Sequence, residues 1–259
     1  MSGNSLRTYK ENTKQEELYK EMYKNQTLQY VVDMKEKYKS LQNKKMTMFK
    51  ALSLLDTFTD SSDPDLLDIP NSIHAFQTAE KIRKKHPDNE EYQIIGLIHD
   101  LGKVLFIFKE PEWSVTGDTF VLGCRLPKSL VYYNHTESHP DRDNTELGIY
   151  NEFCGLDKLH ISFGHDEYLY QVLKQNKDKH KIKEKYWNII RYHSFYPWHT
   201  YGEYTYFMDD KDFYILENIK DFNQYDLYSK NDKDFCLTDD VIDYYKDLLI
   251  KYFPESLQW

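Results

Sequence analysis

The chain has 259 residues, of which 40% are hydrophobic and 16% aromatic, and its formal net charge is −9. This length suits one large domain, and the many tyrosines and phenylalanines can supply a sizeable core. The negative charge argues against nucleic acid, whose phosphate backbone attracts basic proteins, and leaves a neutral small-molecule substrate open.

The cysteine pattern and the lack of long apolar segments predict where in the cell the protein lies. Cys124, Cys154 and Cys236 are far apart and odd in number, which predicts free thiols in a reducing compartment. The N-terminal residues lack the apolar core of a secretory signal, and no run of about 18 apolar residues is present to span a membrane. We therefore expect a cytoplasmic protein without a membrane partner, with a monomer as the default.

The N-terminal part of the chain predicts a polar arm followed by two helices. Residues 1–17 are polar, and their composition alone predicts a disordered arm. Residues 18–43 carry apolar side chains at helical spacing, which predicts one amphipathic helix. A second, short helix is expected at 46–58.

The next predicted helix, 72–85, carries a histidine on its apolar stripe. Asn71 or Ser72 is expected to cap this helix, because both side chains can accept a hydrogen bond from a backbone N–H. His74 lies in its first turn. A single histidine at such a position is more often packed or capping than a metal ligand.

Residues 94–108 (IIGLIHDLGKVLFIF) are apolar on almost every side and predict a buried helix. Burying His99, Asp100 and Lys103 together is costly unless they are paired or bind a metal. His99 and Asp100 can reach one metal, and Lys103 follows on the same side. Gly102 indicates either a close backbone approach or a helix about to end. The alternative is a core helix whose polar residues pair with neighbouring side chains.

The helical period fades between 110 and 154, where glycines and prolines predict loops. Short strands are expected at 119–123 and 129–133. A segment of this length can line or cover a site. His135 and His139 have the spacing of metal ligands, but the loop composition around them predicts that both are solvated.

The second half of the chain returns to helical periodicity. His165 and Asp166 form a second His-Asp pair beside an apolar face, whereas His193 falls near a helix end, where orphan carbonyls are possible partners. Asp226 follows an apolar stripe and alone would be a surface charge. Helices are expected at 156–175, 181–199, 210–230 and 241–253. We therefore predict one all-α domain covering residues 1–259, a helical bundle with a long loop insertion in its middle.

Several helices thus each offer a histidine or a His-Asp pair, and a helical bundle can gather such ligands in its centre. Imidazole and carboxylate ligands without thiolates favour Fe, Mn, Co or Zn, and an aspartate beside a ligating histidine can bridge two metals. The order His74, His99-Asp100, Asp226 resembles the HD-domain superfamily of helical metal enzymes. That resemblance usually implies a phosphohydrolase.

Longer motifs across the chain, from about residue 6 to 259, resemble the myo-inositol oxygenase family. They are DIPNSIHAFQTAE (68–80), GLIHDLGK (96–103), WSVTGDTFVLGC (113–124), TELGIY (145–150), SFGHDEYLY (162–170), RYHSFYPWHT (191–200) and FNQYDLY (222–228). The resemblance implies a non-haem di-iron oxygenase on an HD-type helical fold. It also implies that myo-inositol and O2 are the substrates, with ring cleavage giving D-glucuronate and water.

The same resemblance implies two iron ions per chain, a mixed-valent Fe(II)/Fe(III) pair bridged by Asp100. The implied ligands are His74, His99, Asp100 and Asp226 for one iron, and Asp100, His165 and His193 for the other, which stays open to substrate oxygens. Lys103 and Asp100 are implied as the catalytic residues. The ammonium of Lys103 can donate a hydrogen bond to a developing alkoxide.

Contacts with inositol are also implied by the resemblance, at Arg7, Asp60, Ser61, Ser62, Lys103, Gly117, Asp118, Ser194 and Lys230. Arg7 would make residues 1–17 a lid, in place of the disordered arm that composition predicts. The loop 60–67 departs from the family pattern, because it carries serine where relatives often have an acidic residue and is longer by one residue.

Two other functions remain as alternatives. An HD-type phosphohydrolase would hydrolyse nucleotide or phosphodiester substrates with Mn or Co and ignore O2, and the negative charge weighs modestly against it. A non-catalytic binding protein would be expected to have lost a ligand, but no ligand position is missing.

Overall fold

The computed structural model describes residues 9–41, 44–63, 70–229 and 235–259. Arg7, Lys230 and residues 64–67 of the predicted substrate loop lie outside these ranges. The described elements are α1 (Lys14–Asn25), α2 (Leu28–Lys37), β1 (Lys45–Met46), α3 (Met48–Leu54), η1 (Leu55–Thr57), α4 (Asn71–Lys85), α5 (Glu90–Ile98), η2 (Leu101–Phe108), η3 (Glu112–Ser114), β2 (Val121–Leu122), η4 (Tyr133–Thr136), η5 (Leu156–Lys158), β3 (His160–Ile161), α6 (His165–Gln175), α7 (Glu184–Tyr192), α8 (Tyr196–His199), η6 (Thr205–Phe207), α9 (Asp210–Ser229), α10 (Asp239–Tyr252) and β4 (Leu257–Gln258).

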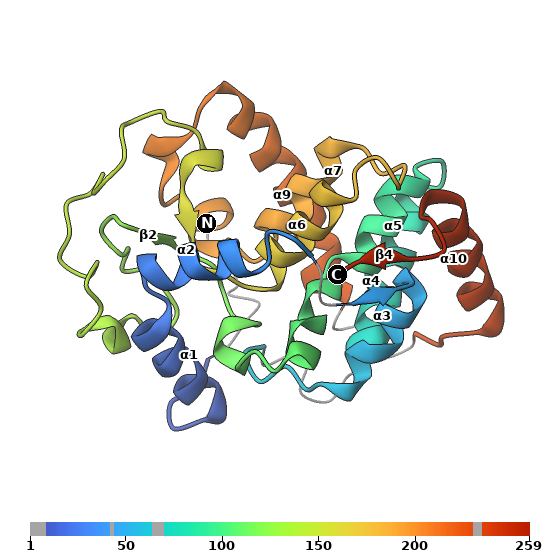
Figure 1. Ribbon diagram of the computed structural model, residues 1–259, viewed down its shortest axis with the longest axis horizontal. Coiled ribbons are helices and arrows are strands. Elements are labelled where there is room, and N and C mark those ends of the chain that lie inside the picture. Colours follow the sequence, from blue (N-terminus) through green and yellow to red (C-terminus); the bar gives the residue numbers. More distant parts are fainter. Residues whose placement is uncertain (1–8, 42–43, 64–69, 230–234) are drawn as a thin grey trace.

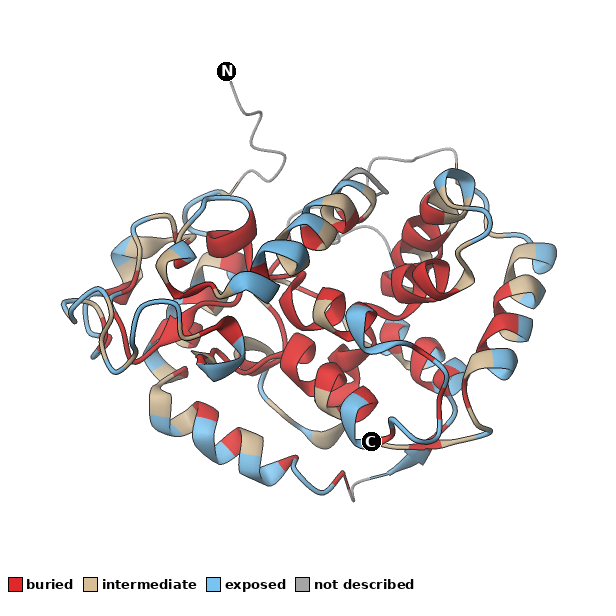
Figure 2. Ribbon diagram, turned by 90° about the horizontal axis from the view of Figure 1, so that it is seen from above, coloured by how far each residue is buried: buried red, intermediate tan, exposed pale blue. Residues whose placement is uncertain are grey.

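Helices dominate the described residues, as the sequence predicts for an all-α fold. Helices α6, α7 and α9 lie in the middle of the molecule (Figure 1). The N-terminal helices α1 and α2 lie with β2 toward one end, and α3, α4, α5 and α10 lie toward the other. Buried residues are concentrated in the central helices (Figure 2). No described helix has the length and apolar character needed to cross a membrane.

The single helix predicted for 18–43 is wrong, because the chain forms α1 and α2 with a break at residues 26–27. Thr27 caps α2, since its side chain accepts a hydrogen bond from the N–H of Tyr30. The amide of Gln26 is held by Phe163, donating to its carbonyl oxygen and accepting from its N–H. Gln26 therefore ends α1, and Thr27 begins α2.

The loop insertion forms one of its two predicted strands. Strand β2 pairs antiparallel with β3, Val121 opposite Ile161, but residues 129–133 form turns and the start of η4. Tyr132 has φ of 52°, in the left-handed region, which a continuous strand excludes. A second short antiparallel ladder joins β1 to β4 near the C-terminus.

The helix predicted for 156–175 begins only at His165, after η5 and β3. The helix predicted for 181–199 is likewise divided into α7 and α8, with Pro197 within the first two residues of α8. The predicted cap of α4 is also wrong. Asn71 is its first helical residue and donates to the carbonyls of Leu55 and Phe58. The carboxylate of Asp56 accepts the N–H of Ser72 in the first turn instead.

The buried helix predicted for 94–108 changes character at the His-Asp pair. Helix α5 ends before His99, and the 3-10 helix η2 begins after Asp100. Gly102 lies at this junction, where a Cβ would come 1.9 Å from the carbonyl oxygen of His165. The close backbone approach suggested by this glycine is therefore present, and it brings the start of α6 against η2.

A Gly102→Ala substitution is expected to lower the free energy of unfolding by about 1–3 kcal/mol, because the new methyl group overlaps backbone atoms. Urea unfolding measures this loss. Gly164→Ala is the matched control, because its Cβ would meet a carbonyl oxygen only at 3.7 Å and its backbone is extended, with φ of −157°. Equal stability of the two variants would contradict the close approach.

Candidate metal centre

Five separate parts of the chain bring histidines and aspartates together. His74 comes from the first turn of α4, His99 and Asp100 from the end of α5, and Asp226 from α9. His165 and Asp166 begin α6, and His193 follows α7. The packing of α4 on α5 and α9, and of α6 on α7 and η2, holds these segments together. All of these side chains are buried.

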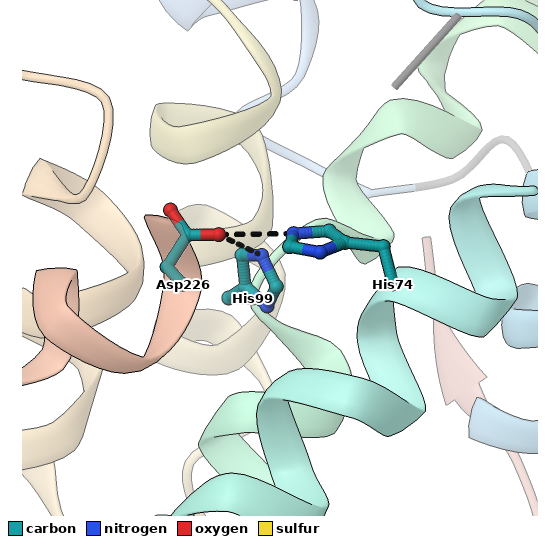
Figure 3. A group of neighbouring side chains, drawn as sticks. All are labelled: His74, His99 and Asp226. Carbon is teal, nitrogen blue, oxygen red and sulfur yellow. Dashed lines mark ion pairs between the residues drawn. The ribbon is translucent and has the colours of Figure 1, made fainter. Parts of the chain in front are cut away.

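The first cluster joins α4, α5 and α9. The Asp226 Oδ1 atom lies 2.9 Å from His74 Nε2 and 3.5 Å from His99 Nε2. Figure 3 shows the three side chains pointing toward one another. Two imidazoles and a carboxylate at these distances can share one metal ion.

The second cluster joins α6 to the residue after α7. His165 Nε2 and His193 Nε2 are 3.3 Å apart. Asp100 Oδ1 lies 3.3 Å from the first of these atoms and 3.5 Å from the second. Its other oxygen, Oδ2, lies 3.6 Å from His99 Nε2. The carboxylate of Asp100 therefore faces both clusters, one oxygen to each, which is the arrangement of a bridging ligand.

Backbone carbonyls set the tautomers of three histidines. The Nδ1 atom of His99 lies 2.8 Å from the Gly96 oxygen, and those of His165 and His193 lie 2.7 Å from the oxygens of Val115 and Ile190. Because a carbonyl oxygen only accepts, each Nδ1 carries the proton. In the neutral rings, each Nε2 then presents a lone pair to the centre. This is how histidine ligands are commonly oriented.

The charges at the centre favour a cation. Lys103 Nζ lies 2.8 Å from Asp60 Oδ2 and 2.8 Å from Asp100 Oδ2. Burial lowers the pKa of Lys103, but the two carboxylates outweigh this and raise it. Burial would also lower the pKa of His165, yet Asp166 and Asp100 raise it to about 10. Positive charge beside these carboxylates is therefore stabilised, and a metal ion at the two clusters would supply such charge.

A cavity of about 30 Å³ lies between the clusters. Of the predicted substrate contacts, the structure brings Asp60, Ser62, Lys103, Gly117, Asp118 and Ser194 to its wall. Ser61 is not in this lining, and its N–H donates to Glu112 Oε1. Asp63 and Tyr196 line the cavity too and were not predicted. Tyr196 lies two residues after Ser194 in the motif RYHSFYPWHT, and this position was the signal in the sequence that could have indicated it.

Helix α1 packs against the same cavity wall. Gln15 donates a hydrogen bond to the carbonyl of Ser62. The Tyr19 hydroxyl lies 3.2 Å from Asp118 Oδ1 and also accepts from the Asp118 N–H. A Cβ at Gly117 would come 3.0 Å from the sulfur of Met22. The last residues of the predicted lid and those that immediately follow it therefore contact two parts of the predicted substrate site.

The prediction that His135 and His139 are solvated is wrong for His139, which is buried. Its Nε2 donates to the carbonyl of Gln26, and its Nδ1 accepts the N–H of Asp141. His135 is half-buried and its ring contacts Glu16 Oε1. These hydrogen bonds draw the polar loop against α1. Neither histidine belongs to the metal-like groups of the described residues.

Comparison with known proteins identifies the family of the chain. The family model for myo-inositol oxygenase matches residues 12–259. The chain is 45% identical to an inositol oxygenase of Danio rerio, over 93% of this chain and 87% of the relative. It is 46% identical to the Homo sapiens inositol oxygenase, over 93% and 85%. A probable inositol oxygenase of Oryza sativa is 42% identical, over 99% and 86%. The chain therefore belongs to the myo-inositol oxygenase family.

Proposed function

We propose that this protein cleaves the ring of myo-inositol with O2 to give D-glucuronate and water. The observation that carries the proposal is the buried carboxylate of Asp100, which lies between two histidine clusters and beside the ammonium of Lys103. Curated relatives that cover most of the chain are named inositol oxygenases. A phosphohydrolase activity is therefore not favoured.

The proposed cofactor is a pair of iron ions, mixed-valent Fe(II)/Fe(III) in the active state. His74, His99, Asp100 and Asp226 would hold one ion, and Asp100, His165 and His193 the other. When bound, the iron pair supplies Lewis acidity toward the substrate hydroxyls and electron transfer to O2. The converging Nε2 lone pairs and the excess of buried carboxylates support this assignment.

Lys103 is proposed to stabilise the substrate oxygen as it loses its proton. Its ammonium is buried, and the pKa of Lys103 is raised by Asp100 and Asp60 after the opposing effect of burial. The side chain therefore stays protonated and can donate to a developing alkoxide. Asp100 fixes the position of the ammonium through a 2.8 Å contact.

The other proposed substrate contacts suit a polyol, because they combine hydrogen-bond acceptors with hydroxyl donors. They are Asp60, Ser61, Ser62, Gly117, Asp118 and Ser194, together with Arg7 and Lys230 outside the described residues. A 30 Å³ cavity holds only a few water molecules. Entry of inositol thus requires movement of the wall formed by α1 and residues 60–63. We propose that residues 1–17 act as the lid there.

We also propose a single-domain, monomeric protein of the cytoplasm. The three cysteines support a reducing compartment, because Cys124 is buried, Cys154 half-buried and Cys236 exposed, all as free thiols. Light scattering on a sizing column tests the oligomeric state.

The test of the function is an oxygen-electrode assay on purified, iron-loaded and partly oxidised protein. Myo-inositol should start O2 consumption, with one D-glucuronate formed per O2. Absence of O2 consumption overturns the proposal. Hydrolysis of nucleotides or phosphodiesters with Mn or Co, without O2 uptake, would favour the phosphohydrolase.

A Lys103→Met substitution is expected to lower kcat about 100-fold, because one preorganised donor to the developing oxyanion is lost. Steady-state O2 uptake together with an iron count measures this, and the iron content should persist. Lys183→Met is the control, because Lys183 is exposed and forms an ion pair with Glu91, and neither residue lines the cavity. Unchanged kcat in Lys103→Met would contradict the role of its ammonium.

A further inference from the structure

Another cavity lies at the surface, where α5, α7 and α9 meet the residue that follows α4. Its volume is about 180 Å³, compared with about 30 Å³ for the central cavity, and the two share no lining residue. The rings of His86, Tyr92 and Tyr186 and the charged side chains of Lys185 and Asp221 contribute to its wall. This surface cavity is large enough for a small organic molecule.

The rings of the surface cavity have their polar tips already paired. Tyr92 and Tyr186 are stacked, with ring centroids 6.1 Å apart and planes inclined by 23°. The centroid of the His86 ring lies 5.3 Å from that of Tyr92. The Tyr186 hydroxyl donates to Asn89 Oδ1, and the Tyr92 hydroxyl donates to Asp221 Oδ2. What the two tyrosines offer a ligand is therefore ring surface, and the face of such a ring attracts cations.

Asp221 places a carboxylate beside these rings. Its Oδ2 accepts from Tyr92, and within the part of the chain that the structure describes its Oδ1 has no hydrogen bond and no lysine or arginine nitrogen lies within 4.0 Å of either oxygen. His86 Nε2 lies 4.0 Å from Oδ2 but only 2.9 Å from the Tyr225 hydroxyl, with which it pairs. A carboxylate next to ring faces, with no ammonium or guanidinium of the described residues beside it, suits an organic cation.

The protein's own Lys185 shows that this ring surface accepts an ammonium group. Its Nζ lies 4.7 Å from the centroid of the Tyr186 ring, within the distance of a cation–π contact. The Lys185 side chain is exposed, so it can turn into solvent. A cation that enters the surface cavity can therefore take its place on the ring.

We propose that the surface cavity is a further binding site, for a small organic cation that carries an ammonium group. The cation lies against the rings of Tyr92 and Tyr186, with its charge toward Asp221. The net charge of the chain, −9, draws cations toward the protein. The site depends on neither the metal centre nor the proposed reaction. The competing interpretation is a water-filled depression in which Lys185 is the permanent partner of Tyr186.

Calorimetric titration of the purified protein with choline tests the site, because choline has an uncharged isostere. In 3,3-dimethyl-1-butanol a carbon atom replaces the nitrogen, so the two probes share a shape and differ in charge. Choline should bind at one site, and the alcohol should bind about tenfold more weakly. Equal binding of the two probes, or no saturable binding of choline, overturns the proposal.

Charge variants test whether choline binds in this cavity. Asp221→Asn should weaken choline binding about tenfold, because the carboxylate charge beside the rings is lost. Glu217→Gln is the matched control, because Glu217 lies one turn earlier in α9, is exposed and does not line the cavity. Its choline affinity should stay within about twofold of wild type, because water and salt screen an exposed charge. Equal losses in the two variants would show attraction by overall charge alone and overturn the proposal.

Lys185→Met should bind choline at least as tightly as wild type, because the substitution removes a competing cation from the Tyr186 ring. The same calorimetric titration measures this affinity. Weaker binding of choline to Lys185→Met overturns the proposal.

Two substitutions at Tyr186 separate the ring from its hydroxyl. Tyr186→Phe keeps the ring face and loses only the hydrogen bond to Asn89, so choline should bind as tightly as to wild type. Tyr186→Leu should bind choline about tenfold more weakly. Equal affinities of these two variants overturn the proposal. If Tyr186→Leu does not fold, Asp221→Asn still decides, because the Asp221 side chain is half-exposed.

Discussion

An Asp100→Asn variant is expected to lose both metal ions and to turn over inositol at least about 1000-fold more slowly. Asp100 is the one predicted ligand whose two oxygens face different histidine clusters. Neutralising it removes a charge from both metal positions and breaks the ion pair with Lys103. Iron analysis after anaerobic reconstitution, together with O2 uptake, measures the effect.

Asp141→Asn is the matched control for this variant. Asp141 is also buried, but its carboxylate accepts from the Gly123 N–H and from the Asn144 side chain, away from the centre. The Asp141→Asn variant should keep two ions and full activity, even if its free energy of unfolding falls. If Asp100→Asn kept one ion at full occupancy, Asp100 would belong to a single metal and would not be a bridge.

Alanine variants of His165 and His193 are expected to lose one iron selectively and to abolish turnover. Both rings belong to the second cluster, with Nε2 atoms 3.3 Å apart. The first cluster, around His74 and Asp226, shares no side chain with them. Iron content should therefore fall from two ions to one, whereas Asp100→Asn should lose both. Metal analysis and single-turnover assays in parallel measure the two effects.

A buried histidine outside the centre gives the control. His180 donates from Nε2 to the Leu173 carbonyl and accepts the Ile182 N–H at Nδ1, so His180→Ala should keep both irons. Full iron content and activity in either His165→Ala or His193→Ala would show that the ligand assignment is wrong.

The candidate ligands could be selected from sequence because each is a polar residue on or beside an apolar helix face. His99 and Asp100 stand out in this way, since they are the polar pair inside the most apolar segment of the chain. His74 and Asp226 are 152 positions apart in the sequence. Spacing alone could not show that His74 Nε2 lies 2.9 Å from Asp226 Oδ1. That required the packing of α4 on α9, which only tertiary structure fixes. The family motifs, not the periodicity, joined these residues into one set.

Two of the wrong predictions have a long-range cause that local patterns do not encode. His139 was predicted to be solvated because of its loop composition, but the carbonyl of Gln26, more than 100 residues earlier, holds it inside. The helix at 156–175 was extended too far because β3 pairs with β2, which lies about 40 residues earlier. Asp166 forms half of a His-Asp pair in the sequence, but nothing there indicates that its carboxylate also lies 3.8 Å from His193 Nε2.

The most direct test of the two-metal centre is an anaerobic iron count combined with magnetic resonance of the partly oxidised protein, recorded with and without myo-inositol. We expect about two irons per chain and a signal from a magnetically coupled Fe(II)/Fe(III) pair that changes when inositol is added. A single iron per chain, or two uncoupled irons whose spectrum ignores inositol, would contradict it.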